Sequence, residues 1–176
     1  RSFRETHRIN LGPLRCLCGM FVKTYHKDTL EDQGLYGEFR ESFYSTNQKG
    51  VIRGMHFQHS PYDHAKIVYC TSGKLLDVIL DIRIGSPTYG QAAQVELSAT
   101  NYKAVYLPKG VAHGFAVLED NTCMVYLTST VHAPNADDGI RIDSFGFDWP
   151  IAHPIRSERD QAFEGLETFQ SPFIYA

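Results

Sequence analysis

The feature that most constrains this fold is a succession of short β-type runs separated by turn residues. In KLLDVILDIR, residues 74–83, apolar side chains at every second position alternate with a set that contains Asp77, Asp81 and Arg83. This period of two is typical of a β-strand. Comparable runs cover residues 14–25, 39–45, 51–58, 65–71, 91–98, 103–108, 113–118 and 123–130. Many short strands with short connections predict an all-β protein, either a closed barrel or a double-sheet jelly roll.

No repeat, low-complexity tract or long linker divides the chain, so we expect one domain over residues 1–176. The tail beyond Trp149, which contains the segment SERDQAF, predicts a loop and a short helix packed outside the barrel.

Composition limits the partners and the cellular location. The net charge is −3 with acids and bases interleaved, which argues against binding to nucleic acid or to an anionic membrane. No apolar stretch approaches the length of a membrane span, and the start RSFRETHR lacks the apolar core of a signal peptide. Cysteines stand at 16, 18, 70 and 123 without a Cys-x-x-Cys pair, so we expect reduced thiols, no zinc site and a cytoplasmic protein.

The run VIRGMHFQ, residues 51–58, carries polar groups that do not suit a buried strand. Arg53, His56 and Gln58 stand among apolar residues, and such groups cost free energy when they are buried without partners. Strand alternation places His56 and Gln58 on one face and Arg53 on the other. A bulge at Gly54 would turn Arg53 and His56 to the same side, and we predict one there.

Four further residues are candidates for chemistry. Lys66 alternates with apolar residues in its strand, and His113 begins the strand that follows the Pro108-x-Gly110 turn. Tyr126 lies in the last long run, and Asp160 stands in the segment SERD. Each of them alone is more typical of a structural residue, and only their combination suggests a site.

Three motifs in this order resemble the dTDP-4-dehydrorhamnose 3,5-epimerase family. They are R-G-x-H-F-Q, D-x-R-x-G-S-P-T-[FY]-G and P-x-G-x-x-H-G-F, and the resemblance extends over about residues 36–165, including GIRIDSFGFDWP and SERD. It implies a cupin-type jelly-roll barrel that forms a homodimer and needs neither metal nor cofactor. The implied reaction inverts carbons 3 and 5 of a nucleotide-linked 4-keto-6-deoxy sugar, in deoxysugar and polysaccharide biosynthesis.

The resemblance also implies roles for individual residues. His56 matches the general base, Asp160 the acid that hydrogen-bonds to it, and Tyr126 the general acid. Lys66 matches a lysine of the sugar site, where it would stabilise the developing enolate. The expected substrate-binding residues are Arg53 at the diphosphate, Gln58, His113 and His132.

Two departures from the family pattern leave the substrate open. The family's acidic-Arg-Gly signature is absent from residues 22–43, where Lys23 and His26 are the only replacements we can name. A Tyr-Tyr pair near the nucleotide end is replaced by Val131-His132. The nucleotide (dTDP, CDP or GDP) and the inversion of one or both carbons therefore stay undecided.

Three other functions compete with this interpretation. A 3-epimerase or ketoisomerase on a related sugar nucleotide would use the same barrel, and so would a binding module without catalysis. A metal-dependent cupin oxygenase would draw its ligands from His56, His59, His64 and His113. Against that third option, Gln58 occupies the second position of the usual H-x-H pair, and Lys66 adds positive charge nearby.

Overall fold

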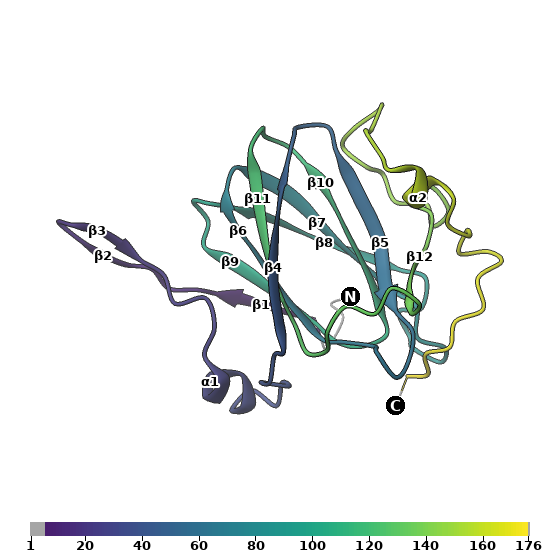
Figure 1. The fold of residues 1–176 in the computed structure, drawn as a ribbon, viewed down its shortest axis with the longest axis horizontal. Coiled ribbons are helices and arrows are strands. Elements are labelled where there is room, and N and C mark those ends of the chain that lie inside the picture. Colours follow the sequence, from purple (N-terminus) through teal and green to yellow (C-terminus); the bar gives the residue numbers. More distant parts are fainter. Residues whose placement is uncertain (1–5, 176) are drawn as a thin grey trace.

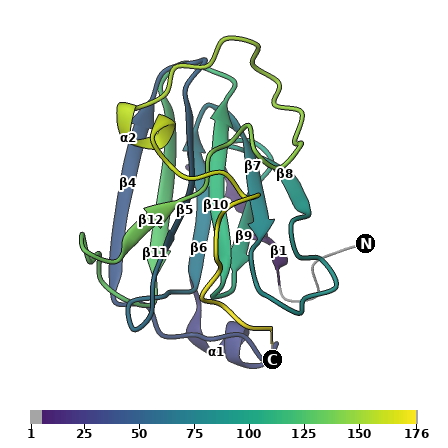
Figure 2. The ribbon, with the colours of Figure 1, turned by 90° about the vertical axis from the view of Figure 1, so that its right-hand side faces the viewer.

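Two five-stranded antiparallel sheets face each other and form a jelly-roll barrel (Figures 1 and 2). The structure, a computed structural model, describes residues 6–175. One sheet has the order β1-β9-β6-β11-β4 and the other the order β12-β5-β10-β7-β8. The strands of the first sheet are β1 (His7–Asn10), β9 (Lys103–Leu107), β6 (Lys66–Ser72), β11 (Thr122–Thr128) and β4 (Glu41–Asn47). Those of the second are β12 (Asp137–Gly139), β5 (Ile52–Gln58), β10 (Val111–Val117), β7 (Lys74–Asp81) and β8 (Ala92–Ser98). The predicted all-β, cupin-type class is confirmed.

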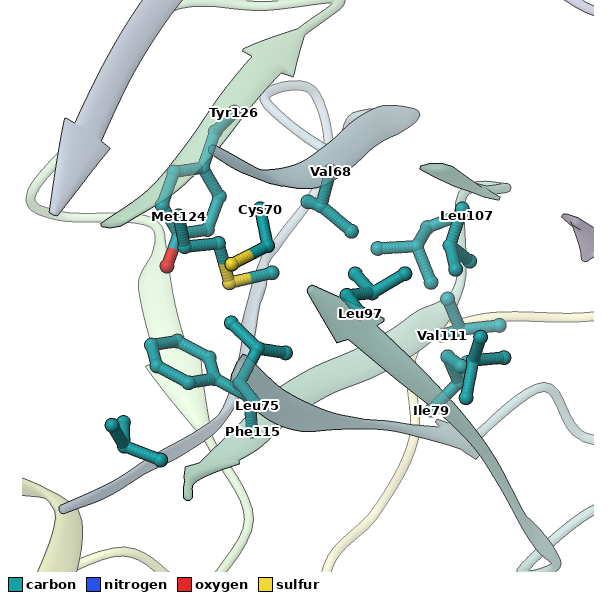
Figure 3. Packing of buried hydrophobic residues seen from close by; sticks show 13 residues of the cluster. Val68, Cys70, Leu75, Ile79, Leu97, Leu107, Val111, Phe115, Met124 and Tyr126 are labelled. Carbon is teal, nitrogen blue, oxygen red and sulfur yellow. The ribbon is translucent and has the colours of Figure 1, made fainter. Parts of the chain in front are cut away.

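The core lies between the two sheets (Figure 3). Leu75 and Ile79 of β7 pack there with Val68 of β6 and Leu107 of β9. Because successive side chains of a strand point to opposite faces, Asp77 shares this inner face. Burying such apolar side chains contributes roughly 1.5–3 kcal/mol each, which offsets part of the cost of the polar groups inside.

The other face of β7 is buried as well. Val78 and Leu80 belong to a second cluster that includes Ile140 and Phe173, with Trp149 packed against it. The segment after β12 crosses the outside of this sheet (Figure 2) and ends in the short helix α2 (Glu158–Gln161) and an extended tail. The expected loop and helix outside the barrel are therefore present.

The N-terminal part differs from the single strand expected over residues 14–25. Strands β2 (Leu14–Cys16) and β3 (Gly19–Phe21) form a hairpin that projects away from the barrel (Figure 1), and the short helix α1 (Lys27–Glu31) follows. The turn at Leu17-Cys18, which Gly19 follows, explains the error, because apolar content alone does not reveal where a strand reverses.

From the sequence we expected all four cysteines to be reduced, and this prediction is wrong for at least one of them. Cys70 and Cys123 are free, whereas Cys18, at the exposed tip of the hairpin, is disulfide-bonded. Within residues 6–175, no helix is long and apolar enough to cross a membrane.

The predicted bulge is present in β5. His113 of β10 pairs with His56 of β5, and Phe115 of β10 pairs with Arg53 of β5. The two pairs are two residues apart along β10 but three residues apart along β5, so β5 contains one extra residue. The extra residue falls at Gly54, whose φ is +123°. A Cβ atom at this position would lie 2.5 Å from the Cα of a β10 glycine and 2.8 Å from the His113 carbonyl oxygen, so only glycine fits here.

We predict that Gly54→Ala lowers the free energy of unfolding by roughly 2–5 kcal/mol, because backbone strain and steric overlap act together. Gly85→Ala is the matched control: Gly85 also has a positive φ, +84°, but no atom within 4 Å of an added Cβ. It should cost only about 1 kcal/mol. Urea unfolding of both variants measures the difference, and equal losses would contradict the close packing at Gly54.

Candidate active site

A cavity of about 400 Å³ opens between the two sheets. It is lined by residues of β4, β5, β6, β10, β11 and β12 and of the loops beside them. Seven of the eight predicted site residues line it: Arg53, His56, Gln58, Lys66, His113, Tyr126 and His132. The eighth, Asp160, is buried and contacts His56.

His56 is held by Asp160. Its Nε2 atom lies 3.0 Å from Asp160 Oδ1, while the backbone N–H of Gly54 donates to Oδ2 at 3.0 Å. Burial alone would raise the pKa of Asp160, but the hydrogen bond and charge of His56 and the Gly54 N–H outweigh it and lower that pKa to about 2. The carboxylate is therefore ionised and accepts a hydrogen bond from the Nε2–H group, which leaves Nδ1 as the basic nitrogen.

A second imidazole–carboxylate pair lies in the same cavity wall. His113 Nε2 is 2.6 Å from Asp77 Oδ1, and both side chains are buried. Burial lowers the pKa of His113 although Asp77 acts in the opposite direction. Asp77 was not among the residues predicted from the sequence. It shares a strand face with Leu75 and Ile79, but both faces of β7 are covered, so alternation alone does not mark that face as the inner one.

Lys66 places an ammonium group in the cavity. Burial lowers its pKa from 10.5 to about 8, and the charges of Asp137 and Asp77 only partly compensate. Within residues 6–175, its Nζ makes no hydrogen bond or ion pair. Lys66 is thus still mainly charged at neutral pH, and its donors are available to an anionic oxygen of a ligand.

Tyr126 faces the cavity from the sheet opposite to His56 and lies beside Met124 at one end of the core (Figure 3). Burial raises the pKa of its phenol strongly, so the hydroxyl is neutral and carries a proton. Its only hydrogen bond within the described chain is a long one, 3.4 Å from Oη to Ser45 Oγ. Its ring stacks on Phe43, with 4.6 Å between centroids and 15° between planes.

Arg53 points toward the cavity because of the bulge. Its Nε donates to Asn47 Oδ1 at 2.7 Å, and Asn47 is itself fixed because its amide nitrogen donates to the Thr122 carbonyl oxygen. One side of the guanidinium is thus anchored, which leaves its remaining donors for an oxyanion.

Gln58 and His132 lie toward the other end of β5. The Gln58 Oε1 accepts from the Ala133 N–H and its Nε2 donates to the Tyr62 carbonyl oxygen, so the amide ties two loops to the cavity wall. His132 borders the cavity, and its backbone N–H donates to Glu41.

His64 was considered only as a metal ligand in the sequence analysis. It also lines the cavity, and Gln58 Nε2 lies 3.0 Å from its Nδ1. Burial, followed by the charge of Lys66, lowers its pKa to about 2, so the ring is neutral. Its buried Nε2 has no partner within residues 6–175.

The four histidines suggested for a metal site do not converge. His59 instead pairs with Asp138, with 2.8 Å between Nε2 and Oδ2. Among the residues from 6 to 175, no three His, Cys, Asp or Glu side chains form a group that could hold a metal ion.

The two-sheet barrel, with paired imidazoles, a lysine and a neutral tyrosine around one cavity, defines a cupin-type carbohydrate epimerase as the class. The sequence profile of dTDP-4-dehydrorhamnose 3,5-epimerase matches residues 5–168. The chain belongs to this family.

Relatives of known name agree with this assignment. The dTDP-4-dehydrorhamnose 3,5-epimerase of Shigella flexneri is 37% identical over 145 residues, which are 81% of this chain and 80% of that protein. A dTDP-4-dehydrorhamnose 3-epimerase of Streptomyces niveus is 36% identical over 146 residues, 81% of this chain and 70% of the relative. Among solved structures, a similar one is the dTDP-6-deoxy-D-glucose-3,5-epimerase of Legionella pneumophila in complex with dTDP-4-keto-L-rhamnose. The two structures superpose with a TM-score of 0.95 at 31% sequence identity, and the match covers 100% of this chain and 97% of that one.

We predict that Lys66→Met stabilises the protein at neutral pH by roughly 1–3 kcal/mol, because the folded state then no longer holds a partly desolvated charge. The folded-state pKa of Lys66 lies below its unfolded value, so the unfolded chain binds more protons between about pH 8 and 10.5. The stability of the unmodified protein should therefore rise over that range relative to the variant. Urea unfolding as a function of pH measures this, and parallel profiles would contradict a lowered pKa for Lys66.

Proposed function

We propose that this chain is a dTDP-4-dehydrorhamnose 3,5-epimerase, which inverts carbons 3 and 5 of a dTDP-linked 4-keto-6-deoxyhexose. The observation that carries the proposal is the arrangement of His56 on one sheet and neutral Tyr126 on the other, with Lys66 lining the cavity they share. The relatives support the substrate, since they are named as enzymes of dTDP-linked sugars and one is bound to dTDP-4-keto-L-rhamnose.

The first step removes a proton from the carbon next to the ketone. His56 Nδ1 accepts this proton, and the electrons of the C–H bond move to form an enolate with its charge on the oxygen at carbon 4. Asp160 keeps the proton on Nε2 and stabilises the imidazolium that forms. Lys66 donates to the enolate oxygen, where its charge is most effective because the site is partly dry.

The second step returns a proton to the opposite face of the same carbon. Tyr126 gives its hydroxyl proton to that carbon, and the enolate electrons form the new C–H bond as the ketone is restored. The enzyme then holds an imidazolium and a phenolate, and a proton passes between them through solvent before the next inversion. The same sequence at the other carbon next to the ketone gives the second inversion.

The remaining polar residues bind the substrate in this proposal. Arg53 contacts the diphosphate, because its planar fork suits paired oxyanions. His113, fixed by Asp77, borders the sugar, while Gln58 shapes the wall. His132 contacts the nucleotide in place of the aromatic pair of the family.

A homodimer is part of the proposal. The β2–β3 hairpin projects from the barrel and exposes Leu14, Leu17 and Phe21 (Figure 1). Exposed apolar side chains on a projecting hairpin are typical of an interaction surface. We also place the protein in the cytoplasm. The free thiols of Cys70 and Cys123 suit a reducing compartment, whereas the disulfide at Cys18 does not.

We predict that the protein exchanges the hydrogens at carbons 3 and 5 of dTDP-4-keto-6-deoxyglucose for deuterium in heavy water, and that NMR detects the inverted product. His56→Asn should lower both exchange rates by roughly 10²–10⁴-fold, because the general base is lost. The CDP- and GDP-linked forms of the same sugar are tested in parallel, and they should react more slowly than the dTDP-linked sugar. Label at carbon 3 alone would instead indicate a 3-epimerase, like the Streptomyces niveus relative, and no exchange with any of the three would refute the proposal.

We predict that Phe21→Lys shifts the protein from dimer to monomer in sedimentation equilibrium, since it places a charge on the hairpin surface. Phe21 is 60% exposed, so the change should not disturb the fold. Ile174→Lys, on a residue that is 79% exposed in the C-terminal tail, is the matched control and should stay dimeric. A monomeric unmodified protein, or a dimeric Phe21→Lys variant, would count against the hairpin as the dimer contact.

A further inference from the structure

The hydroxyl of Tyr126 is weakly held by hydrogen bonding. A 3.4 Å contact with Ser45 Oγ is near the limit for an O–H···O hydrogen bond and contributes little orientation. The ring of His113 meets Tyr126 edge-on with 6.4 Å between centroids, which is a looser contact than a stack. A packing contact, rather than a hydrogen bond, must therefore set the direction in which the phenol points.

Phe43 supplies that contact. It lies directly across from Tyr126 in the β4–β11 pairing, and its ring covers one face of the phenol at a centroid distance of 4.6 Å. Directly paired side chains of this kind are the closest neighbours that a sheet offers. The stack therefore restricts rotation of the phenol about its Cα–Cβ bond.

The position of Phe43 is unusual for a core-facing aromatic residue. Strand β4 forms the edge of its sheet, and Phe43 is 44% exposed while it lines the cavity. Its neighbour Tyr44 is 71% exposed and does not line the cavity. Phe43 thus combines two features that Tyr44 lacks: its ring borders the cavity, and one face of it stacks on the proposed acid.

We infer that Phe43 is a positioning residue that holds the Tyr126 hydroxyl toward the face of the sugar that receives the returning proton. This inference rests on the proposed function.

The intermediate enolate has two fates. Solvent-derived hydrogen returns from His56 Nδ1 to the original face, which gives exchange without inversion, or Tyr126 protonates the opposite face, which gives inversion.

Phe43 therefore controls how many exchange events end in inversion. The ratio of inversion to exchange is independent of substrate affinity, since both outcomes arise from the same bound enolate. Loss of an aromatic stack changes a conformational equilibrium by roughly 2- to 10-fold. Removal of the Phe43 ring should lower the ratio by that factor.

The test measures deuterium uptake and inversion at carbon 3 in the same NMR experiment for the full chain and four variants. Phe43→Leu keeps an apolar side chain but removes the stack, and its inversion-to-exchange ratio should fall roughly 2- to 10-fold. Phe43→Tyr keeps an aromatic ring at this position, so its inversion-to-exchange ratio should equal that of the unmodified protein. Tyr126→Phe marks the limit, with exchange but little inversion.

Tyr44→Leu is the matched control, because it removes an aromatic ring from the adjacent position of β4 outside the cavity; its ratio should not change. Thermal melting verifies that each variant is folded. An unchanged ratio in Phe43→Leu, or an equal loss of exchange and inversion, would overturn the inference while the proposed function stands. An unmodified protein that neither exchanges nor inverts would refute the proposed function, and the role of Phe43 with it.

Discussion

The bulge at Gly54 is the constraint on which the site depends. It inserts one residue into β5, so that Arg53 and His56 line the same cavity although three positions separate them. The same residue donates its backbone N–H to Asp160, which places the carboxylate against the imidazole. A side chain at this point would strike β10, so the positions of the His56 imidazole, its carboxylate partner and the nearby guanidinium all follow from one glycine.

Much of this could be predicted from the sequence because it depends on local patterns. Strand alternation located most of the strands, and the polar residues around Gly54 required a bulge. Alternation cannot, however, say which face of a strand points inward when both are covered, as in β7, so Asp77 was missed. The contact between Phe43 and Tyr126 was missed because it depends on the pairing of β4 with β11, between strands far apart in the chain.

The cavity concentrates groups that a stable core would avoid. Two imidazole–carboxylate pairs and a lysine with a lowered pKa lie at one end of a barrel whose core cluster is otherwise built of apolar side chains. Burial of such groups costs free energy that the surrounding packing must offset, and their concentration in one place is the physical mark of a catalytic site. The same burial keeps Tyr126 protonated, which its proposed role as the general acid requires.

The most direct test of the central claim is a crystal structure of the protein with a dTDP-linked 4-keto sugar bound. Our account predicts that a carbon next to the ketone lies about 3–3.5 Å from His56 Nδ1, with the Tyr126 hydroxyl on the opposite face of the sugar and Lys66 at the keto oxygen. A sugar bound with both of these carbons out of reach of Nδ1, or with His56 and Tyr126 on the same face, would contradict it.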